Sequence, residues 1–182
     1  MLSHTVITLG GVIPVYSISS FTSGACDMGL FLSAYRNRLD RKGRLSVPAP
    51  FRAALGEGAA GVVMFKSLQH DALEACAISH LERLSDSLDQ QKLSPETYEL
   101  VEATIFGGSQ WLTFDGEGRI SLPENLRHFA GLADEVVFVG RRQTFQLWNP
   151  SRFEAIETTM REKAKARDIS LSQIIAGVRG GT

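Results

Sequence analysis

The sequence predicts an α/β fold of the α+β type, in which one hairpin-and-helix unit occurs twice. Residues 39–52 recur as residues 114–127, 75 positions later and without an insertion. In both copies apolar and polar residues alternate ahead of a proline, which is the period of a half-buried strand. Between the copies, leucines at spacings of three and four predict amphipathic helices. These observations together indicate tandem repeats joined by two linking helices.

Each copy contains a tight turn ahead of its proline. In the first copy, the Asp40 side chain can accept backbone N–H groups two residues on, and Gly43 can supply the positive φ that other residues resist. Asp115 and Gly118 hold the same two positions in the second copy. We therefore assign a structural role in the turn to these four residues.

A strand and a short helix follow each turn. Residues 44–47 alternate in polarity, Pro48 ends the strand because it cannot donate to a ladder, and residues 49–55 favour a helix until Gly56. We expect residues 31–39 to pair antiparallel with residues 44–47 across the turn. Each copy is then a strand, a turn, a strand, a proline and a short helix.

The rest of the chain supplies further strands and three longer helices. Short strands are expected over residues 62–65, 72–77, 136–139 and 145–148. One helix is expected over residues 79–90, and another begins at Ser94 and Pro95 and ends near residues 107–108. The last begins at Asn149 and Pro150, with Phe153, Ile156 and Met160 expected to face the core. The expected organisation is an N-terminal extension (1–27), a first repeat (28–78), linking helices (79–108), a second repeat (109–150), and a C-terminal helix with a loosely held tail (151–182).

Positive charge is concentrated in the first copy. The chain has a formal net charge of −1, which argues against indiscriminate coating of nucleic acid. Residues 36–52, the basic segment, nevertheless hold six cations and one anion, a local +5 that leaves −6 elsewhere. Arg36 and Arg38 alternate with Leu39, so both face solvent if Leu39 is buried. A solvated hairpin without a partner is the alternative to a binding surface.

Arginines on a two-stranded hairpin are chemically suited to binding DNA. Such a hairpin fits the major groove, and a guanidinium can donate two bonds to guanine or to a phosphate. Arg41 and Lys42 at the tip are better placed for phosphates than for bases. We expect Arg119 to pair with Asp115 because its surroundings are acidic, and Arg44 to face an external anion instead. The candidate DNA-binding residues are Arg36, Arg38, Arg41, Lys42, Arg44 and Arg119.

The unit Asp-Xaa-Xaa-Gly-Arg-(Leu/Ile)-Ser-(Val/Leu)-Pro, present twice, resembles the MraZ family of bacterial transcriptional regulators. The similarity covers roughly residues 28–156, and each half resembles an AbrB-type (SpoVT-AbrB) swapped-hairpin unit. The resemblance implies tandem swapped-hairpin β-barrel repeats and a ring-shaped homo-oligomer. It also implies a DNA-binding repressor of the division and cell-wall gene cluster, acting on short direct repeats that include its own promoter. Glu117 departs from the polar or basic residue common in the family, which argues against base reading by the second turn.

The resemblance also bears on the N-terminus and the location of the protein. Residues 1–27 lack Lys and Arg, and their apolar run is interrupted by Gly and Pro, so neither a secretory signal nor a membrane span is expected. A lipoprotein site at Cys26 is the alternative. Residues 28–33 resemble the usual start of the family, so we expect translation to begin at Met28. With Cys76 the only other cysteine, we expect a reducing, cytoplasmic setting, and the resemblance implies association with the nucleoid.

Two other classes of function fit the sequence less well. An antitoxin-type AbrB-like adaptor would bind a partner protein, usually through a long flexible tail, whereas here the part after Ile169 is short. An enzyme would need a nucleophile with its base or a pair of carboxylates, and the four histidines show no ligand spacing. We therefore expect no enzyme, cofactor, metal, membrane or small-molecule substrate. The expected partners are double-stranded DNA and further copies of the chain.

Overall fold

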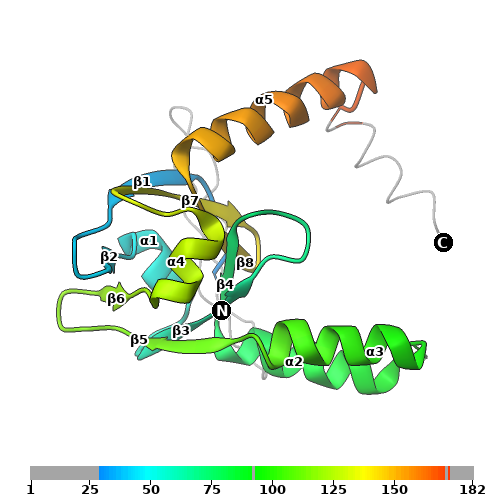
Figure 1. Cartoon of the computed structure of the whole chain (residues 1–182). Helices are drawn as coiled ribbons and strands as arrows, with labels where there is room; N and C mark the ends of the chain where they lie inside the picture. The colour runs from blue at the N-terminus through cyan, green and yellow to red at the C-terminus, as the bar shows by residue number, and fades with distance from the viewer. Residues whose placement is uncertain (1–28, 92, 171, 173–182) are drawn as a thin grey trace, which may run out of the picture.

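A curled antiparallel sheet forms the body of the molecule (Figure 1). The computed structural model describes residues 29–91, 93–170 and 172. Six strands are ordered β1-β7-β8-β4-β3-β5, and two more, β2 and β6, form a separate ribbon. The strands are β1 (Ala34–Arg38), β2 (Arg44–Ser46), β3 (Gly61–Lys66), β4 (Leu73–Cys76), β5 (Gln110–Thr113), β6 (Arg119–Ser121), β7 (Glu135–Arg141) and β8 (Thr144–Trp148).

The strands around each turn pair with the other copy of the repeat. β1 pairs with β7 and β2 pairs with β6, whereas the backbones on the two sides of the first turn are paired only by an isolated bridge between Leu39 and Leu45 among the described residues. The expected pairing of residues 31–39 with residues 44–47 across the turn is therefore wrong. A lone hairpin is only marginally stable in water, whereas exchange gives each strand a full ladder partner and buries Leu45 against Ile120.

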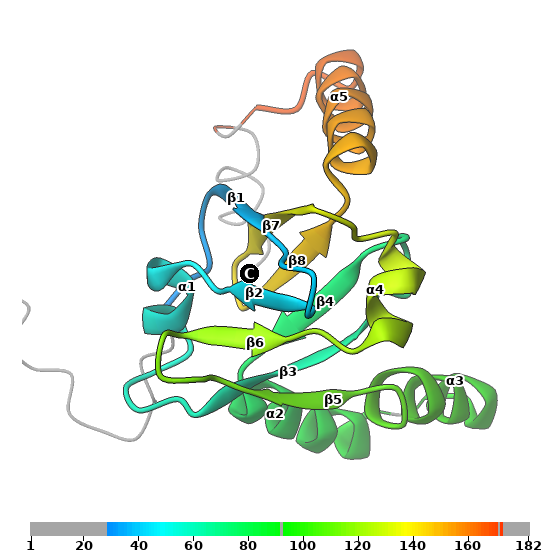
Figure 2. The ribbon, with the colours of Figure 1, turned by 60° about the vertical axis from the view of Figure 1, so that its left-hand side comes forward.

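The exchange makes the two copies nearly equivalent in space. The pairing of β1 with β7 matches that of β5 with β3, and β4 and β8 pair in the middle of the sheet. In Figure 2 the β2–β6 ribbon lies between the edge strands β1 and β5, with α1 (Ala49–Ala54) and α4 (Glu124–Ala130) at its opposite ends. The side chain of Asn37 ties β1 to the ribbon by donating to the Ser46 carbonyl at 2.6 Å.

The core lies between the ribbon and the sheet. Phe51 of α1 packs on Phe145 of β8, with ring centroids 5.0 Å apart, and Phe31 packs on the same ring at 4.9 Å. Aromatic pairs at such distances add to the stabilisation from buried area. Leu39 is buried and both Arg36 and Arg38 are exposed, so the expected strand parity is confirmed.

The linking helices project beyond the sheet (Figure 1). α2 (Ile78–Gln90) buries Leu81 and Leu88, as their spacing predicts. α3 (Pro95–Val101) has the predicted cap, since Ser94 Oγ accepts the backbone N–H of Thr97 at 3.2 Å. The helix then widens into a π-helical turn, η1 (Glu102–Phe106), which the sequence pattern did not predict.

The last helix, α5 (Pro150–Ala166), leaves the sheet after its first turns (Figure 1). Phe153 and Ile156 pack in part against Trp148, but Met160 is 48% exposed. The expectation that all three face the core is therefore wrong for Met160. Within the described part of the chain, no helix is both long and apolar enough to cross a membrane. The predicted extension 1–27, the start at Met28 and most of the predicted tail lie outside the described residues.

Candidate nucleic-acid interface

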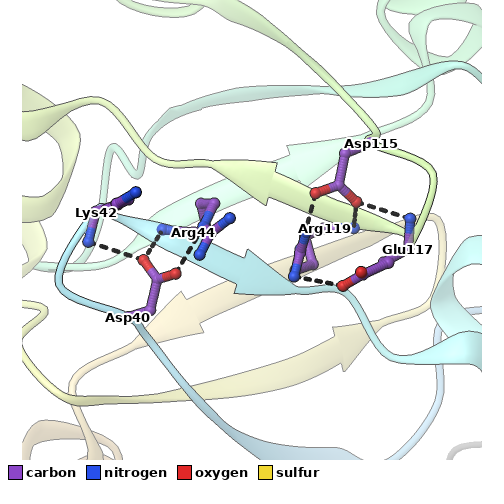
Figure 3. Close-up of polar contacts among 6 residues, drawn as sticks. All are labelled: Asp40, Lys42, Arg44, Asp115, Glu117 and Arg119. Carbon is purple, nitrogen blue, oxygen red and sulfur yellow. Dashed lines mark hydrogen bonds and ion pairs between the residues drawn. The ribbon is translucent and has the colours of Figure 1, made fainter.

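The outward face of the β2–β6 ribbon carries two arginines and two serines. Arg44 lies opposite Ser121, and Arg119 lies opposite Ser46. Alternate residues of a strand point to opposite faces, so these side chains face outward while Leu45 and its partner on β6 face the core. Figure 3 shows both arginines on the ribbon, each beside the aspartate of its own turn.

The first turn (residues 40–44) is built around one carboxylate. Asp40 Oδ1 accepts the backbone N–H groups of Lys42 at 2.9 Å and Arg44 at 2.8 Å, and Oδ2 accepts from Arg44 Nε at 2.6 Å. Gly43 has a φ of 77°, as the turn requires. The backbone N–H of Arg44 is the main cause that lowers the pKa of Asp40. The turn roles of Asp40 and Gly43 follow from this geometry.

The second turn (residues 115–119) repeats the geometry. Asp115 accepts the backbone N–H groups of Glu117 at 2.9 Å and Arg119 at 3.0 Å, and also Arg119 Nε at 2.7 Å. Gly118 has a φ of 72°. The backbone N–H of Arg119 is the main cause that lowers the pKa of Asp115 to about 2, and the hydrogen bond to Asp115 raises the pKa of Arg119.

Arg44 therefore has an intramolecular partner equivalent to that of Arg119, because each arginine binds the aspartate four residues before it. The expectation that Arg44 would lack this ion pair is wrong, because the carboxylate needed to shape the turn also reaches Nε. The two turns differ instead at their tips, where Glu117 binds Arg119 Nη1 (Figure 3) and Lys42 holds the equivalent place. The first turn has three cations and one carboxylate, and the second has one cation and two carboxylates.

The cations of the basic segment do not form one surface. Arg36 forms an ion pair with Glu154 of α5, on the far side of β1 from the core. Arg52 points inward and donates to the Val47 carbonyl. Arg38 is exposed but lies opposite Glu135 of β7. The positive residues that remain together are those of the first turn, namely Arg41, Lys42 and Arg44.

One cation near the first turn was missed from the sequence. A Cβ atom on Gly43 would lie 3.3 Å from the guanidinium carbon of Arg127, so this arginine of the second copy supports the first turn. Its Nε is buried and has no hydrogen-bond partner among the described residues. The available signal was that Arg52 and Arg127 are the last identical pair of the repeat.

Comparison with known sequences identifies relatives of the chain. A model of the family described as "MraZ protein, putative antitoxin-like" matches residues 30–74 and 105–171. Proteins named "Transcriptional regulator MraZ" are similar over most of their length. The protein of Rickettsia bellii (strain OSU 85-389) is 38% identical over 146 residues, covering 79% of this chain and 97% of that protein. The protein of Pelagibacter ubique (strain HTCC1062) is 41% identical over 143 residues, covering 78% and 92%.

The chain belongs to the MraZ family. Both turns lie inside the matched segments, whereas residues 75–104, which include all of α2 and α3 and the first part of η1, lie between them. The matched part of this MraZ-family chain is thus the ribbon, the short helices α1 and α4, the whole of α5, and the sheet except for the last two residues of β4.

Other chemistry has little support in the described part of this MraZ-family protein. No group of three or more His, Cys, Asp or Glu side chains there could hold a metal ion. Burial raises the pKa of the Cys76 thiol to about 12, so Cys76 is protonated at neutral pH and a poor nucleophile. The His70 ring packs on Trp148 at 5.2 Å beside a cleft of about 700 Å³ along α5.

Proposed function

We propose that this MraZ-family protein is a transcriptional regulator that binds double-stranded DNA through its first turn. The observation that carries the proposal is the cluster of Arg41, Lys42 and Arg44 on an exposed turn with only one carboxylate. Clustered cations repel one another, and a polyanion relieves that repulsion. Its relatives in Rickettsia and Pelagibacter are named transcriptional regulators.

Of the three cations in the first turn, Arg44 has the side-chain geometry best suited to contact DNA. Asp40 holds its Nε, and its two terminal nitrogens have no anionic partner among residues 29–91, 93–170 and 172. The side chain is 40% exposed. A guanidinium fixed at Nε keeps two parallel donors for guanine O6 and N7, or for one phosphate. Asp40 is thus a positioning residue, and Arg41 and Lys42 contact phosphates that set the register.

The assembly and target are proposed from the family resemblance. The exchange of strands between the two copies supports a swapped-hairpin unit, with residues 28–78 and 109–150 as its repeats. We propose a homo-oligomeric ring that binds short direct repeats upstream of the division and cell-wall genes, its own promoter included, and represses them. Several turns at fixed spacing gain effective concentration without new contacts. Such a protein acts in the cytoplasm, at the nucleoid.

A second candidate function is an adaptor that binds a partner protein. The observation in its favour is the family description, which includes the words antitoxin-like. Protein–DNA binding through phosphates weakens steeply with salt, because neutralising each phosphate releases a counterion. A flat salt response of the upstream fragment would favour the adaptor.

The test is fluorescence anisotropy with a labelled fragment of the upstream region at fixed salt. Arg44→Ala should weaken binding roughly 5- to 150-fold, since a good bidentate contact contributes about 1–3 kcal/mol. Arg119→Ala should weaken it less, and Arg161→Ala on α5 serves as a matched loss of charge with no expected effect. Urea unfolding verifies that each variant is folded. Equal losses for Arg44→Ala and Arg119→Ala would refute the assignment to the first turn.

A further inference from the structure

We propose that Glu117 keeps the second turn off DNA, so that each chain presents a single DNA-binding turn and an asymmetric binding site. This inference rests on the proposed DNA binding and deepens it. It concerns the difference between two turns that the chain places on one ribbon, close enough for Asp40 to contribute to the raised pKa of Arg119.

The backbone does not distinguish the two turns. Gly43 and Gly118 have φ values of 77° and 72°. The three bonds to Asp40 are 2.9, 2.8 and 2.6 Å long, and those to Asp115 are 2.9, 3.0 and 2.7 Å. Both arginines therefore leave equivalent strands with Nε bound to an aspartate. Any difference in DNA binding has to come from the side chains at the tips.

Glu117 changes both the availability of Arg119 and the charge that DNA would meet. Its carboxylate binds Arg119 Nη1 while Asp115 binds Nε, so two of the three guanidinium nitrogens have anionic partners within the turn. The Arg119 side chain is 31% exposed and that of Glu117 is 70% exposed. Glu117 thus stands where the first turn presents Lys42, and a phosphate approaching this tip meets a carboxylate first.

The charge of Glu117 matters more than the strength of its ion pair. An exposed ion pair is weak, so the Glu117–Arg119 contact alone would not prevent Arg119 from turning to a phosphate. Whichever way Arg119 turns, residues 115–119 hold two carboxylates and one cation, and this net negative charge is repelled by the phosphate backbone. Removing the negative charge should therefore release the turn for binding, and reversing it should reproduce the first turn.

One active turn breaks the symmetry of the ribbon. A two-fold arrangement with two equal DNA-binding tips matches a palindromic site, because operator symmetry mirrors protein symmetry. In this chain the backbones of the turns are related in that way, but only the first tip is basic. Each copy should then recognise a sequence with a direction, which is the element from which direct repeats are built.

Glu117→Lys in the full-length protein tests the inference, with Glu96→Lys on α3 as the matched change of charge. Salt titrations with the upstream fragment measure the number of phosphate contacts. Glu117→Lys should bind at least tenfold more tightly. Its salt slope should steepen by roughly 1 to 2 units, since each added phosphate contact contributes about 0.9. Glu96→Lys should not change the slope, and adding Arg119→Ala to Glu117→Lys should remove about half of the gain.

Two outcomes would overturn the inference while leaving the proposed function intact. In one, the parent protein binds, Arg44→Ala weakens it, and Glu117→Lys behaves like Glu96→Lys. In the other, the whole gain of Glu117→Lys survives Arg119→Ala, so that Arg119 was never restrained. A parent protein that binds the fragment without salt dependence would instead refute the proposed function, and this inference with it.

Discussion

Arg52 lies directly against Gly118, although the two residues belong to different copies of the repeat. A Cβ atom on Gly118 would lie 2.7 Å from both the guanidinium carbon and Nε of Arg52. Arg127 has the reciprocal position against Gly43, and the Val47 N–H donates to the Gly118 carbonyl at 3.1 Å. The helix of each copy therefore supports the turn of the other, so a change in one copy affects the geometry of both.

Gly118→Ala should destabilise the protein by about 1–3 kcal/mol. The substitution combines a φ of 72° with a contact to Arg52 that is too close for a methyl group. Gly116→Ala, two residues away in the same turn, is the control, because a Cβ atom there meets nothing within 4 Å. Its effect should stay within about 0.5 kcal/mol. Urea unfolding measures both, and equal stabilities for the two variants would contradict the packing described.

Arg52→Met and Arg127→Met should differ in stability despite their equivalent positions. Arg52→Met removes the hydrogen bond to the Val47 carbonyl and should cost about 0.5–1.5 kcal/mol. Arg127→Met removes a buried Nε that has no partner in the described structure, so it should be neutral or stabilising. Thermal unfolding of both variants checks the order, and a larger loss for Arg127→Met would reverse our interpretation.

Asn149→Ala should destabilise the start of α5 by about 1–2 kcal/mol. Asn149 Oδ1 accepts the N–H groups of Ser151 and Arg152, and Nδ2 donates to the Gly131 carbonyl at 2.8 Å. Ser94→Ala removes a cap from α3, which buries no residue, and should affect global unfolding less. Hydrogen exchange along α5 reports the local effect. Unchanged protection of α5 in Asn149→Ala would contradict the prediction.

The Asp115 carboxylate of the second turn should make the stability of the protein depend on pH below pH 4. The pKa of Asp115 is about 2 in the folded protein, below its ordinary value of 3.8. A lowered pKa contributes stability above pH 4 that is lost as the pH falls toward 2. Asp115→Asn should therefore make the fall in stability between pH 4 and pH 2 shallower. Glu162→Gln, an exposed change on α5, should not, and equal slopes for all three proteins would exclude the linkage.

Local features were predictable from the sequence because short-range chemistry decides them. Asp40 and Gly43 specify the turn, Ser94 specifies a helix cap, and strand parity places Arg36 and Arg38 on the exposed face. Long-range partners were not predictable in the same way. Alternating polarity shows that a strand is half-buried but not which strand it joins, so the sequence pattern favours the nearest neighbour along the chain as the partner.

In the candidate site, too, local features were predictable from the sequence and long-range contacts were not. The net charge of the basic segment could be counted, but no local pattern indicates that Glu154, 118 residues away, forms an ion pair with Arg36. The shared role of Asp40 in shaping the turn and binding Arg44 was also hidden, because one carboxylate performs both tasks. The difference between Lys42 and Glu117 could be predicted from the sequence, since the two residues hold equivalent positions when the copies are aligned.

The interleaving of the two copies has a consequence for the synthesis of the protein. β2 emerges from the ribosome 75 residues before its partner β6, and β1 emerges still further ahead of β7. At a synthesis rate of about 5–20 residues per second, the apolar face of β2 remains without its partner strand for roughly 4–15 s. The nascent first copy therefore exposes an apolar strand during translation, and a chain stalled before residue 119 lacks the ladder partners of both β1 and β2.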